Sequence, residues 1–373
     1  MIKVCFLISS LCNEGPVNVV YNILQHIDYT VFDISIITFI PEKENSKMEE
    51  FKKLPIQICQ LSPERKIGPL CLFFRLRKAV NSIHPDILHA HCPRSLYLVP
   101  FLSKNYIKMY TIHNYPGELQ RVLYGKWKGE MVIALNHFFS RRIDCAVCCA
   151  PNIQADYLKQ KGWSFPCISN GSSFPIWQQD NFQRNKLRKQ FGLRDDLKYF
   201  IFVGRFSPEK NPGKLIRVFK RLKDKPIGLI LLGDGPLWTA LKKEEDDRIL
   251  LPGFQNNVYE YLIASDIYIS ASNGEGLANT LLESMSIGLP MLLSDIPSHE
   301  IVLSQMPQVV GFLFNQNNEN DLCNKIEQVL KLNAKNTACI VQSIFLEHYT
   351  AKKMSTSYQR LYYTLLNKKQ IRK

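Results

Sequence analysis

The sequence has no long hydrophobic run. No apolar segment approaches the roughly 20 residues that a membrane-spanning helix needs. The opening segment, residues 1–10, is apolar, but it is shorter than the apolar region of a signal peptide, and no small-residue cleavage site follows it. This pattern is typical of a buried first strand, and we therefore expect a cytoplasmic protein.

The sequence also lacks the usual spacing patterns of metal sites and disulfide frameworks. Its 11 cysteines are odd in number and scattered. Cys145 and Cys148 form one Cys-x-x-Cys pair, but no second pair or matching histidine pair lies at a suitable distance. Cysteines inside apolar runs are commonly small buried hydrophobic residues. We therefore expect free thiols and no metal.

Acidic residues are few relative to basic ones. The chain has 33 Asp and Glu residues and 47 Lys and Arg residues, which gives a net charge of +14. Such an excess attracts phosphates, whether on a nucleotide, a lipid head group or a nucleic acid. No helix-turn-helix, zinc-finger or RNA-binding signature accompanies the charge, so we do not expect nucleic acid as a partner.

Short apolar segments alternate with longer amphipathic ones along most of the chain. Near-continuous hydrophobic strands separated by helices indicate parallel sheets covered on both faces. The alternation stops near Gly171 and restarts at residue 198. Residues 171–186 are polar and show no clear period, so we predict a linker there, and 373 residues suit two domains. We therefore predict two doubly wound Rossmann-like domains, with ligands in the cleft between them. The predicted strands are residues 3–10, 32–40, 56–61, 86–91, 108–113, 144–150, 166–171, 198–204, 226–233, 248–254, 266–272 and 289–295.

A complete dinucleotide-binding fingerprint is missing. The segment LLGDGPLW, residues 231–238, has the form of a strand, a glycine turn and a helix start. Trp238 stands where the third glycine of Gly-x-Gly-x-x-Gly would be, and no acidic residue ends a strand about 20 residues later. The sequence therefore disfavours hydride transfer.

Two strand-to-helix turns of the second half carry charged residues. In FVGRFSPEKNP, Gly204 allows a close backbone approach, and Arg205 and Lys210 are suited to neutralise a diphosphate. The alternative is that both cations lie in a solvated loop.

In SNGEGLANTLLESMSIG, the second of these turns, we predict a helix over residues 277–287, closed by Gly288. Its first-turn amides, on Ala278, Asn279 and Thr280, form an anion site. Glu275 precedes the turn, and Glu283 lies one turn beyond Asn279, where it could accept hydrogen bonds from a ribose diol. The alternative is one capping acid and one solvated acid.

The first half has weaker signals. Gly15 lies in the loop between the first strand and a helix, where it could equally be a plain turn residue. His89 and His91 share one face of a strand because side chains alternate along it. His113 ends the next strand, and of the three we expect it to face the cleft.

Four segments in the same order and spacing resemble the family 4 glycosyltransferases, which have the GT-B fold. The segments are FVGRFSPEKNP, GDGPL, PGFQNNVYEYLIASDIYIS and the Glu-x7-Glu of EGLANTLLE. The last helix of that family returns to the first domain. The resemblance therefore implies an acceptor-side domain of residues 1–170 plus 350–373 and a donor-binding domain of residues 171–349.

The resemblance also assigns roles to single residues. It implies that Arg205 and Lys210 bind the donor diphosphate, that Glu283 binds the ribose and that Glu275 contacts the transferred sugar. Gly15 matches the amino-terminal loop glycine, and His113 resembles the acceptor-side histidine near the reacting carbon. The expected catalytic residues are thus His113, Glu275, Arg205 and Lys210. The expected donor-binding residues are Gly15, Gly204, Arg205, Lys210, Gly276, Leu277, Ala278, Asn279, Thr280 and Glu283.

The expected reaction is transfer of a sugar from a UDP- or GDP-sugar to a saccharide acceptor with retention of configuration. No Asp-x-Asp is present, so we expect no metal and no other cofactor. The positive charge and the segment RVLYGKWKGE suggest a lipid-linked acceptor at an anionic membrane surface, as in surface-polysaccharide assembly. Pro16 stands where the family often has a second glycine. Two alternatives remain open, namely a nucleotide-sugar epimerase of the same fold and a non-catalytic basic scaffold.

Overall fold

The chain folds into two compact units, which the computed structural model describes over residues 1–64 and 67–371. Unit 1 comprises Met1–Ser173 and Thr350–Lys373, and unit 2 comprises Phe174–Tyr349. The predicted boundary after residue 170 lies three residues before the end of the first segment of unit 1. Residues 372 and 373 of the predicted first domain lie outside the described residues.

Unit 1 is built on a six-stranded parallel sheet with the order β3-β2-β1-β4-β5-β6. Its strands are β1 (Ile2–Ile8), β2 (Phe32–Thr38), β3 (Gln57–Gln60), β4 (Ile87–Ala90), β5 (Ile107–Ile112) and β6 (Cys145–Cys148). Its helices are α1 (Gly15–Leu24), α2 (Met48–Lys52), α3 (Pro69–Ile83), α4 (Pro93–Leu98), the 3₁₀-helix η1 (Val99–Phe101), α5 (Glu118–Tyr124), α6 (Lys126–Ser140), α7 (Pro151–Lys161) and α16 (Ala351–Ile371).

Unit 2 contains a second six-stranded parallel sheet, with the order β12-β11-β10-β7-β8-β9. Its strands are β7 (Lys198–Val203), β8 (Ile227–Leu232), β9 (Ile249–Gly253), β10 (Ile267–Ser270), β11 (Met291–Ser294) and β12 (Gly311–Phe314). Its helices are α8 (Asn181–Gln190), α9 (Pro212–Arg221), α10 (Trp238–Lys242), α11 (Val258–Ala264), α12 (Asn279–Ile287), α13 (Pro297–Ser304), α14 (Glu319–Val329) and α15 (Ala334–His348).

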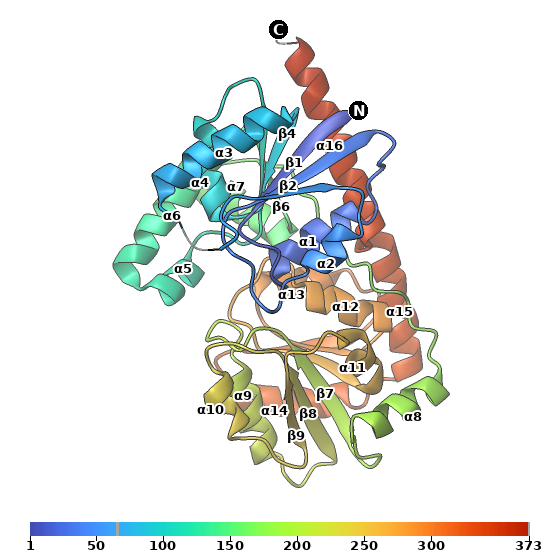
Figure 1. The fold of residues 1–373 in the computed structure, drawn as a ribbon. Coiled ribbons are helices and arrows are strands. Elements are labelled where there is room, and N and C mark those ends of the chain that lie inside the picture. Colours follow the sequence, from blue (N-terminus) through green and yellow to red (C-terminus); the bar gives the residue numbers. More distant parts are fainter. Residues whose placement is uncertain (65–66, 372–373) are drawn as a thin grey trace. The chain divides into compact units, whose positions relative to one another are not determined.

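Both sheets are covered by helices on their two faces (Figure 1), which explains the near-continuous apolar strands. Every residue of β8 and β10 is buried, and so are the last five residues of β1. The predicted α/β architecture of two doubly wound parallel sheets is therefore confirmed.

Three local predictions were wrong. Residues 166–171 form no strand, because only Cys167 pairs there, in an isolated bridge with Cys148. The segment predicted as a linker contains α8, whose first turn is capped by the Asp180 carboxylate accepting from the amides of Phe182 and Gln183. Strand β12 was missed, because it has only four residues and begins with a glycine, and so short an apolar run gives no clear periodic signal.

The last helix, α16, belongs to unit 1, where it packs beside α1 and is drawn in red in Figure 1. Its Tyr362 and Tyr358 are completely buried. The Tyr362 hydroxyl lies 2.8 Å from His89 Nδ1, and the Tyr358 hydroxyl lies 3.0 Å from Thr111 Oγ1. His89 Nε2 lies 2.8 Å from the same threonine oxygen. These buried hydrogen bonds fix the helix to β4 and β5.

The chain passes between the two units at two neighbouring points. The amide of Ala351 donates to the carbonyl of Ser172 over 2.9 Å. A Cβ atom on Gly171 would lie only 2.5 Å from the Thr350 carbonyl oxygen. Glycine is therefore required at 171 by a close backbone approach rather than by its dihedral angles.

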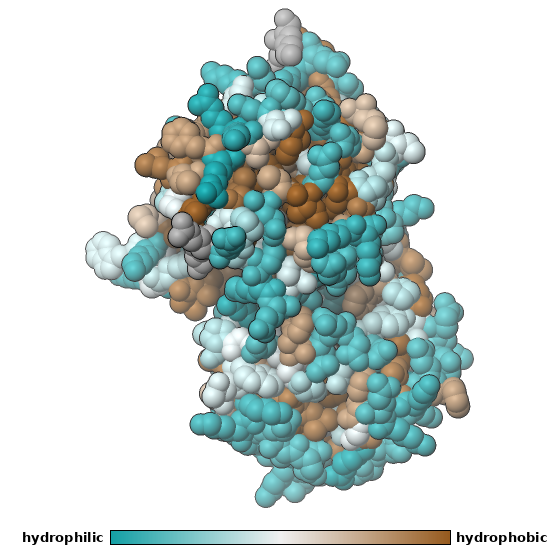
Figure 2. Space-filling model, viewed as in Figure 1, coloured by the Kyte–Doolittle hydropathy of each residue, from teal (hydrophilic) through white to brown (hydrophobic). Residues whose placement is uncertain are grey.

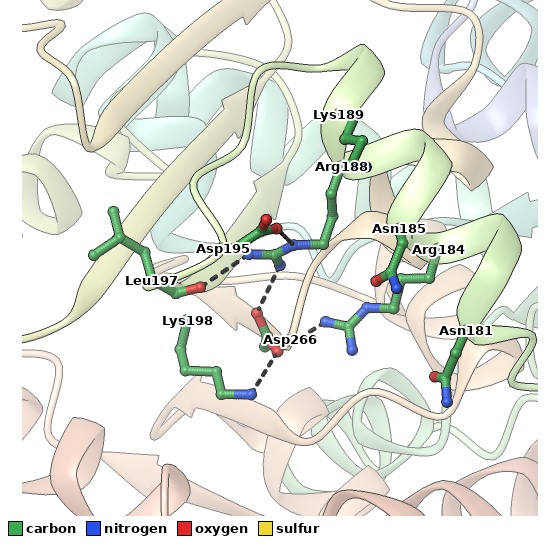
Figure 3. Close-up of a pocket in the computed structure, with 9 residues that line it drawn as sticks. All are labelled: Asn181, Arg184, Asn185, Arg188, Lys189, Asp195, Leu197, Lys198 and Asp266. Atoms are coloured by element: carbon green, nitrogen blue, oxygen red, sulfur yellow. Dashed lines mark hydrogen bonds and ion pairs between the residues drawn. The ribbon is translucent and has the colours of Figure 1, made fainter.

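A buried ion-pair cluster joins α8 to the sheet of unit 2 (Figure 3). The Asp266 carboxylate accepts from Arg184 at 2.8 Å, from Arg188 at 3.3 Å and from the Tyr199 amide at 2.9 Å. Burial raises the pKa of Asp266, but the charge and hydrogen bond of Arg184 and the Tyr199 amide bring that pKa below its usual value. Arg188 also donates to the backbone carbonyls of Arg194 and Leu197. The cluster lines a cavity of about 420 Å³ at the amino-terminal edge of the sheet.

We predict that Asp266→Asn lowers the free energy of unfolding by about 3–5 kcal/mol, because it leaves two poorly exposed guanidinium groups without their carboxylate. Urea denaturation measures this. The matched control is Lys198→Ala, which removes the 63% exposed lysine of the same cluster and should cost at most about 1 kcal/mol. Equal losses of unfolding free energy in the two variants would contradict the role of Asp266 as the buried partner of both arginines.

We also predict that stability depends on the protonation of His89. Burial, with a smaller effect of His113, lowers the pKa of His89 to about 3. An unfolded histidine takes up a proton near pH 6.5, so this contribution to stability is complete above that pH and is lost as the pH falls towards 3.

The corresponding variant is His89→Gln, which should be less stable than the unmodified protein at pH 7.5 because it loses a hydrogen bond. As the pH falls from 6.5 to 4, the free energy of unfolding of this variant should decrease by about 1.4 kcal/mol less per pH unit than that of the unmodified protein. Thermal unfolding across this range measures the difference, and parallel curves would disprove the prediction.

Candidate functional site

The predicted donor-site residues lie at the topological switch point of unit 2. Strands β7 and β10 are neighbours, and from them the chain winds outward in opposite directions. In open parallel sheets, ligands bind beyond the carboxyl ends of the strands at such a point. The turn after β7 carries Arg205 and Lys210, and the turn after β10 carries Glu275.

The two turns contact each other directly. Lys210 Nζ lies 2.8 Å from Glu275 Oε1 in an ion pair. The backbone strengthens the contact, because the Asn273 amide donates to the Glu209 carbonyl over 2.8 Å. Residues 65 positions apart in the sequence are thus held together by the pairing of β7 with β10.

Glu275 is a buried carboxylate. Its side chain is 7% exposed, and its Oε1 also accepts a hydrogen bond from the Ser272 hydroxyl. Burial raises the pKa of Glu275, but the opposing effects of Lys210, His299 and Ser272 are larger in sum and hold that pKa below its usual value. The group is therefore an ionised hydrogen-bond acceptor at neutral pH.

Helix α12 begins two residues later than the sequence predicted. Ala278 is its N-cap, with extended dihedral angles, and Asn279 is its first residue. Gly276 and Leu277 therefore lie in the preceding turn, and Asn279 and Thr280 lie in the first turn of the helix. The helix ends as predicted at Gly288, which adopts the left-handed conformation with φ 83°.

Glu283 lies on α12 and is half-buried. The helix around it is anchored to the sheet, since Thr280 Oγ1 lies 2.9 Å from the hydroxyl of the buried Tyr268 on β10. Glu275 and Glu283 both act on the same tyrosine, because burial and then the negative charges of these two carboxylates raise the pKa of Tyr268 well above its usual range. Both predicted glutamates are therefore close enough to Tyr268 to affect its pKa.

Gly204 and the Gly-Asp-Gly turn pack together at the ends of β7 and β8. A Cβ atom on Gly233 would lie 1.9 Å from the Gly204 carbonyl oxygen, and the Phe206 amide donates to the Asp234 carbonyl over 2.9 Å. The Gly-Asp-Gly turn thus supports the turn that carries Arg205. Arg205 itself is exposed, and it forms no ion pair with any of the described residues.

Sequence reasoning missed a buried histidine behind this site. His299 Nδ1 donates to the Ser294 carbonyl over 2.9 Å and lies 3.3 Å from Ser294 Oγ. The Ser294 hydroxyl in turn donates to the Ser272 carbonyl over 2.6 Å. His299 follows a strand by five residues at the start of α13, and its position directly after a predicted strand end was the one available signal.

Gly15 and His113 belong to unit 1, at the carboxyl ends of β1 and β5. Gly15 is exposed and is the first residue of α1. His113 Nε2 lies 3.2 Å from Nδ1 of the buried His91. Burial lowers the pKa of His113 to about 4, so the imidazole is neutral near pH 7.

Several types of site are absent from residues 1–64 and 67–371. No group of three or more His, Cys, Asp or Glu side chains there is arranged to hold a metal ion. In the same part of the chain, none of the helices has the length and apolar character that crossing a bilayer demands. None of the 11 cysteines, all of which lie among the described residues, forms a disulfide.

Comparison with known proteins identifies a family model that matches part of the second unit, and relatives that match part of the chain. Residues 183–343 match the family model described as glycosyl transferases group 1. The chain is 32% identical over 151 residues to N-acetylgalactosamine-N,N'-diacetylbacillosaminyl-diphospho-undecaprenol 4-alpha-N-acetylgalactosaminyltransferase of Campylobacter jejuni, covering 39% of this chain and 40% of the relative. It is 29% identical over 163 residues to UDP-Gal:alpha-D-GlcNAc-diphosphoundecaprenol alpha-1,3-galactosyltransferase of Escherichia coli, covering 40% and 42%. The matches thus span less than half the length of either relative.

The fold has solved counterparts over its whole length. The structure of Anabaena Alr3699/HepE in complex with UDP and glucose superposes with a TM-score of 0.80 at 17% identity, covering 97% of this chain and 99% of that one. At this identity the likeness establishes the fold. The chain therefore has the GT-B fold of glycosyltransferases, and its residues 183–343 match the glycosyl transferases group 1 family model.

Proposed function

We propose that the protein is a retaining glycosyltransferase that moves a sugar from a UDP- or GDP-sugar to a saccharide acceptor. The observation that carries this proposal is the ion pair between the half-buried Lys210 and the buried Glu275 carboxylate at the switch point of unit 2, in the turn before α12. The pair offers a cation for phosphate and an ionised acceptor for sugar hydroxyls within one hydrogen-bonded unit. The family of residues 183–343 supports the same activity.

Sugar transfer builds negative charge on the leaving diphosphate and positive charge on the anomeric carbon. Lys210 has three N–H donors, of which one contacts Glu275, so the others remain to bind a phosphate oxygen. Arg205 is exposed on the same turn and adds a second cation. The amides at the start of α12 add the positive end of its dipole. Preorganised donors of this kind stabilise a departing diphosphate.

The remaining proposed donor contacts follow from the same arrangement. In this proposal Glu275 accepts hydrogen bonds from the transferred sugar, and Glu283 accepts them from the ribose. Gly15 and His113 act from unit 1, where the neutral His113 accepts or donates a hydrogen bond at the acceptor side. The leaving phosphate takes the proton of the attacking hydroxyl, so attack occurs on the face from which the diphosphate leaves. The cations of the protein replace a metal.

We further propose that the acceptor is lipid-linked and that the protein binds the cytoplasmic face of a membrane during surface-polysaccharide assembly. The two curated relatives support this, because their names specify diphospho-undecaprenol substrates. Unit 1 also has a suitable surface on α5 and α6. Helix α5 has no buried residue, and Trp127 at the start of α6 is 88% exposed. Cations lie beside these hydrophobic side chains, namely Arg121, Lys126 and Lys128.

The hydrophobic character of the surface differs between regions. Figure 2 shows brown hydrophobic side chains reaching the surface over α3, whereas the visible face of unit 2 is mostly teal. On α5 and α6, exposed aromatic and long aliphatic side chains lie among charged ones. Arg121 pairs with Glu118 and Glu130, so Lys126 and Lys128 are the cations suited to the interface of an anionic bilayer.

The activity is tested with purified protein, a panel of UDP- and GDP-sugars and an added diphospholipid-linked saccharide. We predict that Lys210→Ala and Glu275→Ala each lower turnover by about 10²-fold or more, because each removes a contact that strengthens as the diphosphate leaves. The matched control is Lys225→Ala, which breaks an exposed Lys–Glu pair of unit 2 and should leave turnover near normal. Near-normal turnover in Lys210→Ala would contradict the proposed role.

The same assay separates the alternatives. Donor conversion without any acceptor would favour an epimerase. Failure of both UDP and GDP to raise the unfolding temperature, together with an absence of turnover, would favour a scaffold. Chelation with EDTA should leave turnover unchanged if the protein's cations replace a metal.

Membrane binding makes a separate prediction. Replacing Trp127 with alanine, or Lys126 and Lys128 with glutamine, should weaken sedimentation with vesicles of anionic phospholipid at low salt by several-fold. The matched control is Phe182→Ala, because Phe182 is an 81% exposed aromatic residue of unit 2. Equal binding of all variants, or no binding by the unmodified protein, would contradict the membrane surface.

A further inference from the structure

We infer that His299, acting through Ser294 and Ser272, positions the Glu275 carboxylate for sugar transfer. This inference rests on the proposed function of Glu275. It adds three residues to the site that act behind the carboxylate rather than in contact with the donor.

The contacts form one continuous path. His299 Nδ1 donates to the Ser294 carbonyl over 2.9 Å, and the Ser294 hydroxyl donates to the Ser272 carbonyl over 2.6 Å. The Ser272 hydroxyl then donates to Glu275 Oε1. Ser272 Oγ also lies 3.2 Å from Ser270 Oγ, which ends β10. The path therefore connects α13, the end of β11 and the turn after β10 to the carboxylate.

The path is rigid because it is buried. Ser272 and Ser294 are completely buried, and His299 is 1% exposed. A side chain of this kind, locked by packing and by hydrogen bonds, can hold a catalytic group within a fraction of an ångström of its working position. Lys210 restrains Glu275 from the other side, so the carboxylate oxygen Oε1 is held between an ammonium and a hydroxyl.

The tautomer of His299 is fixed by its surroundings. A carbonyl oxygen can only accept, so Nδ1 carries the proton and Nε2 is an acceptor in the neutral ring. His299 Nε2 is buried, and it has no hydrogen-bond partner among the described residues. The imidazole also interacts electrostatically with both Glu275 and Lys210. The hydrogen bond that connects His299 to Ser294 is therefore donated by Nδ1.

Two conservative substitutions of His299 distinguish the role of its Nδ1 from that of its Nε2. The side-chain amide of asparagine places its nitrogen near the position of histidine Nδ1, and that of glutamine places its nitrogen near Nε2. We expect His299→Asn to keep turnover within about 3-fold of the unmodified protein, because the donor to Ser294 survives. We expect His299→Gln and Ser294→Ala to lower kcat by about 10- to 100-fold, the range in which a displaced catalytic group reduces a rate. The KM for the donor sugar and the affinity for free UDP or GDP should stay within about 3-fold.

The matched control is Ser265→Ala. Ser265 is a buried serine of unit 2 whose hydroxyl donates to the Tyr261 carbonyl over 2.8 Å, at the opposite edge of the sheet. Its loss should change the unfolding temperature about as much as Ser294→Ala does, without the fall in kcat. A fall in kcat in both serine variants would mean a general loss of structure and would overturn the inference.

A double-mutant cycle provides the second measurement. If His299 acts through Glu275, His299→Gln should cause little further loss in a Glu275→Ala background. If the effects of the two substitutions on kcat were fully additive, the positioning role of His299 would be overturned. Retained kcat in His299→Gln with loss in His299→Asn would overturn it too, and would assign a direct role to Nε2.

The same series separates this inference from the proposed function. Near-normal turnover in Glu275→Ala would reject the role of Glu275 itself. Loss in Glu275→Ala with normal turnover in His299→Gln and Ser294→Ala would reject only the positioning path.

Discussion

Parallel pairing of the strands is the constraint on which the rest of each unit depends. Since all strands of a sheet run in one direction, their carboxyl ends meet at one edge, and the turns that follow them lie close together. In unit 2, the β7–β10 pairing brings Lys210 to Glu275 although 65 positions separate them. In unit 1, the same rule brings His113 to His91 at the ends of β5 and β4.

In the proposed donor site, a charged group is buried where the loss of hydration costs free energy. A carboxylate at 7% exposure would normally be neutralised, but the ammonium of Lys210 and the hydroxyl of Ser272 keep it ionised. The cluster around Asp266 uses the same chemistry for a different purpose. Its arginines donate to backbone carbonyls and to Asp266, and the cluster lies at the opposite edge of the sheet. We therefore assign it a structural role, in which it holds α8 on the sheet.

Much of the fold was predictable because its signals are local. Apolar strands, glycine turns and the left-handed Gly288 can each be recognised within a dozen residues. Errors occurred where the local signal was weak. Strand β12 has only four residues and begins with a glycine. Residues 166–171 have the composition of a strand, although only Cys167 forms a bridge there, with Cys148. Helix α12 begins later than the predicted Leu277, because Ala278 has extended dihedral angles and is the N-cap, so that Asn279 is the first helical residue.

The sequence by itself determined two parallel α/β sheets and the residue types of the proposed donor site, because hydrophobic periodicity and motif spacing are properties of the chain alone. Only the tertiary structure decided which of these residues touch. It paired Lys210 with Glu275, turned His113 Nε2 towards His91, and placed the unforeseen His299 and Ser294 behind the carboxylate. The physical reason is that hydrogen bonds and ion pairs depend on distances of about 3 Å, and such distances between remote residues are set by strand order and packing.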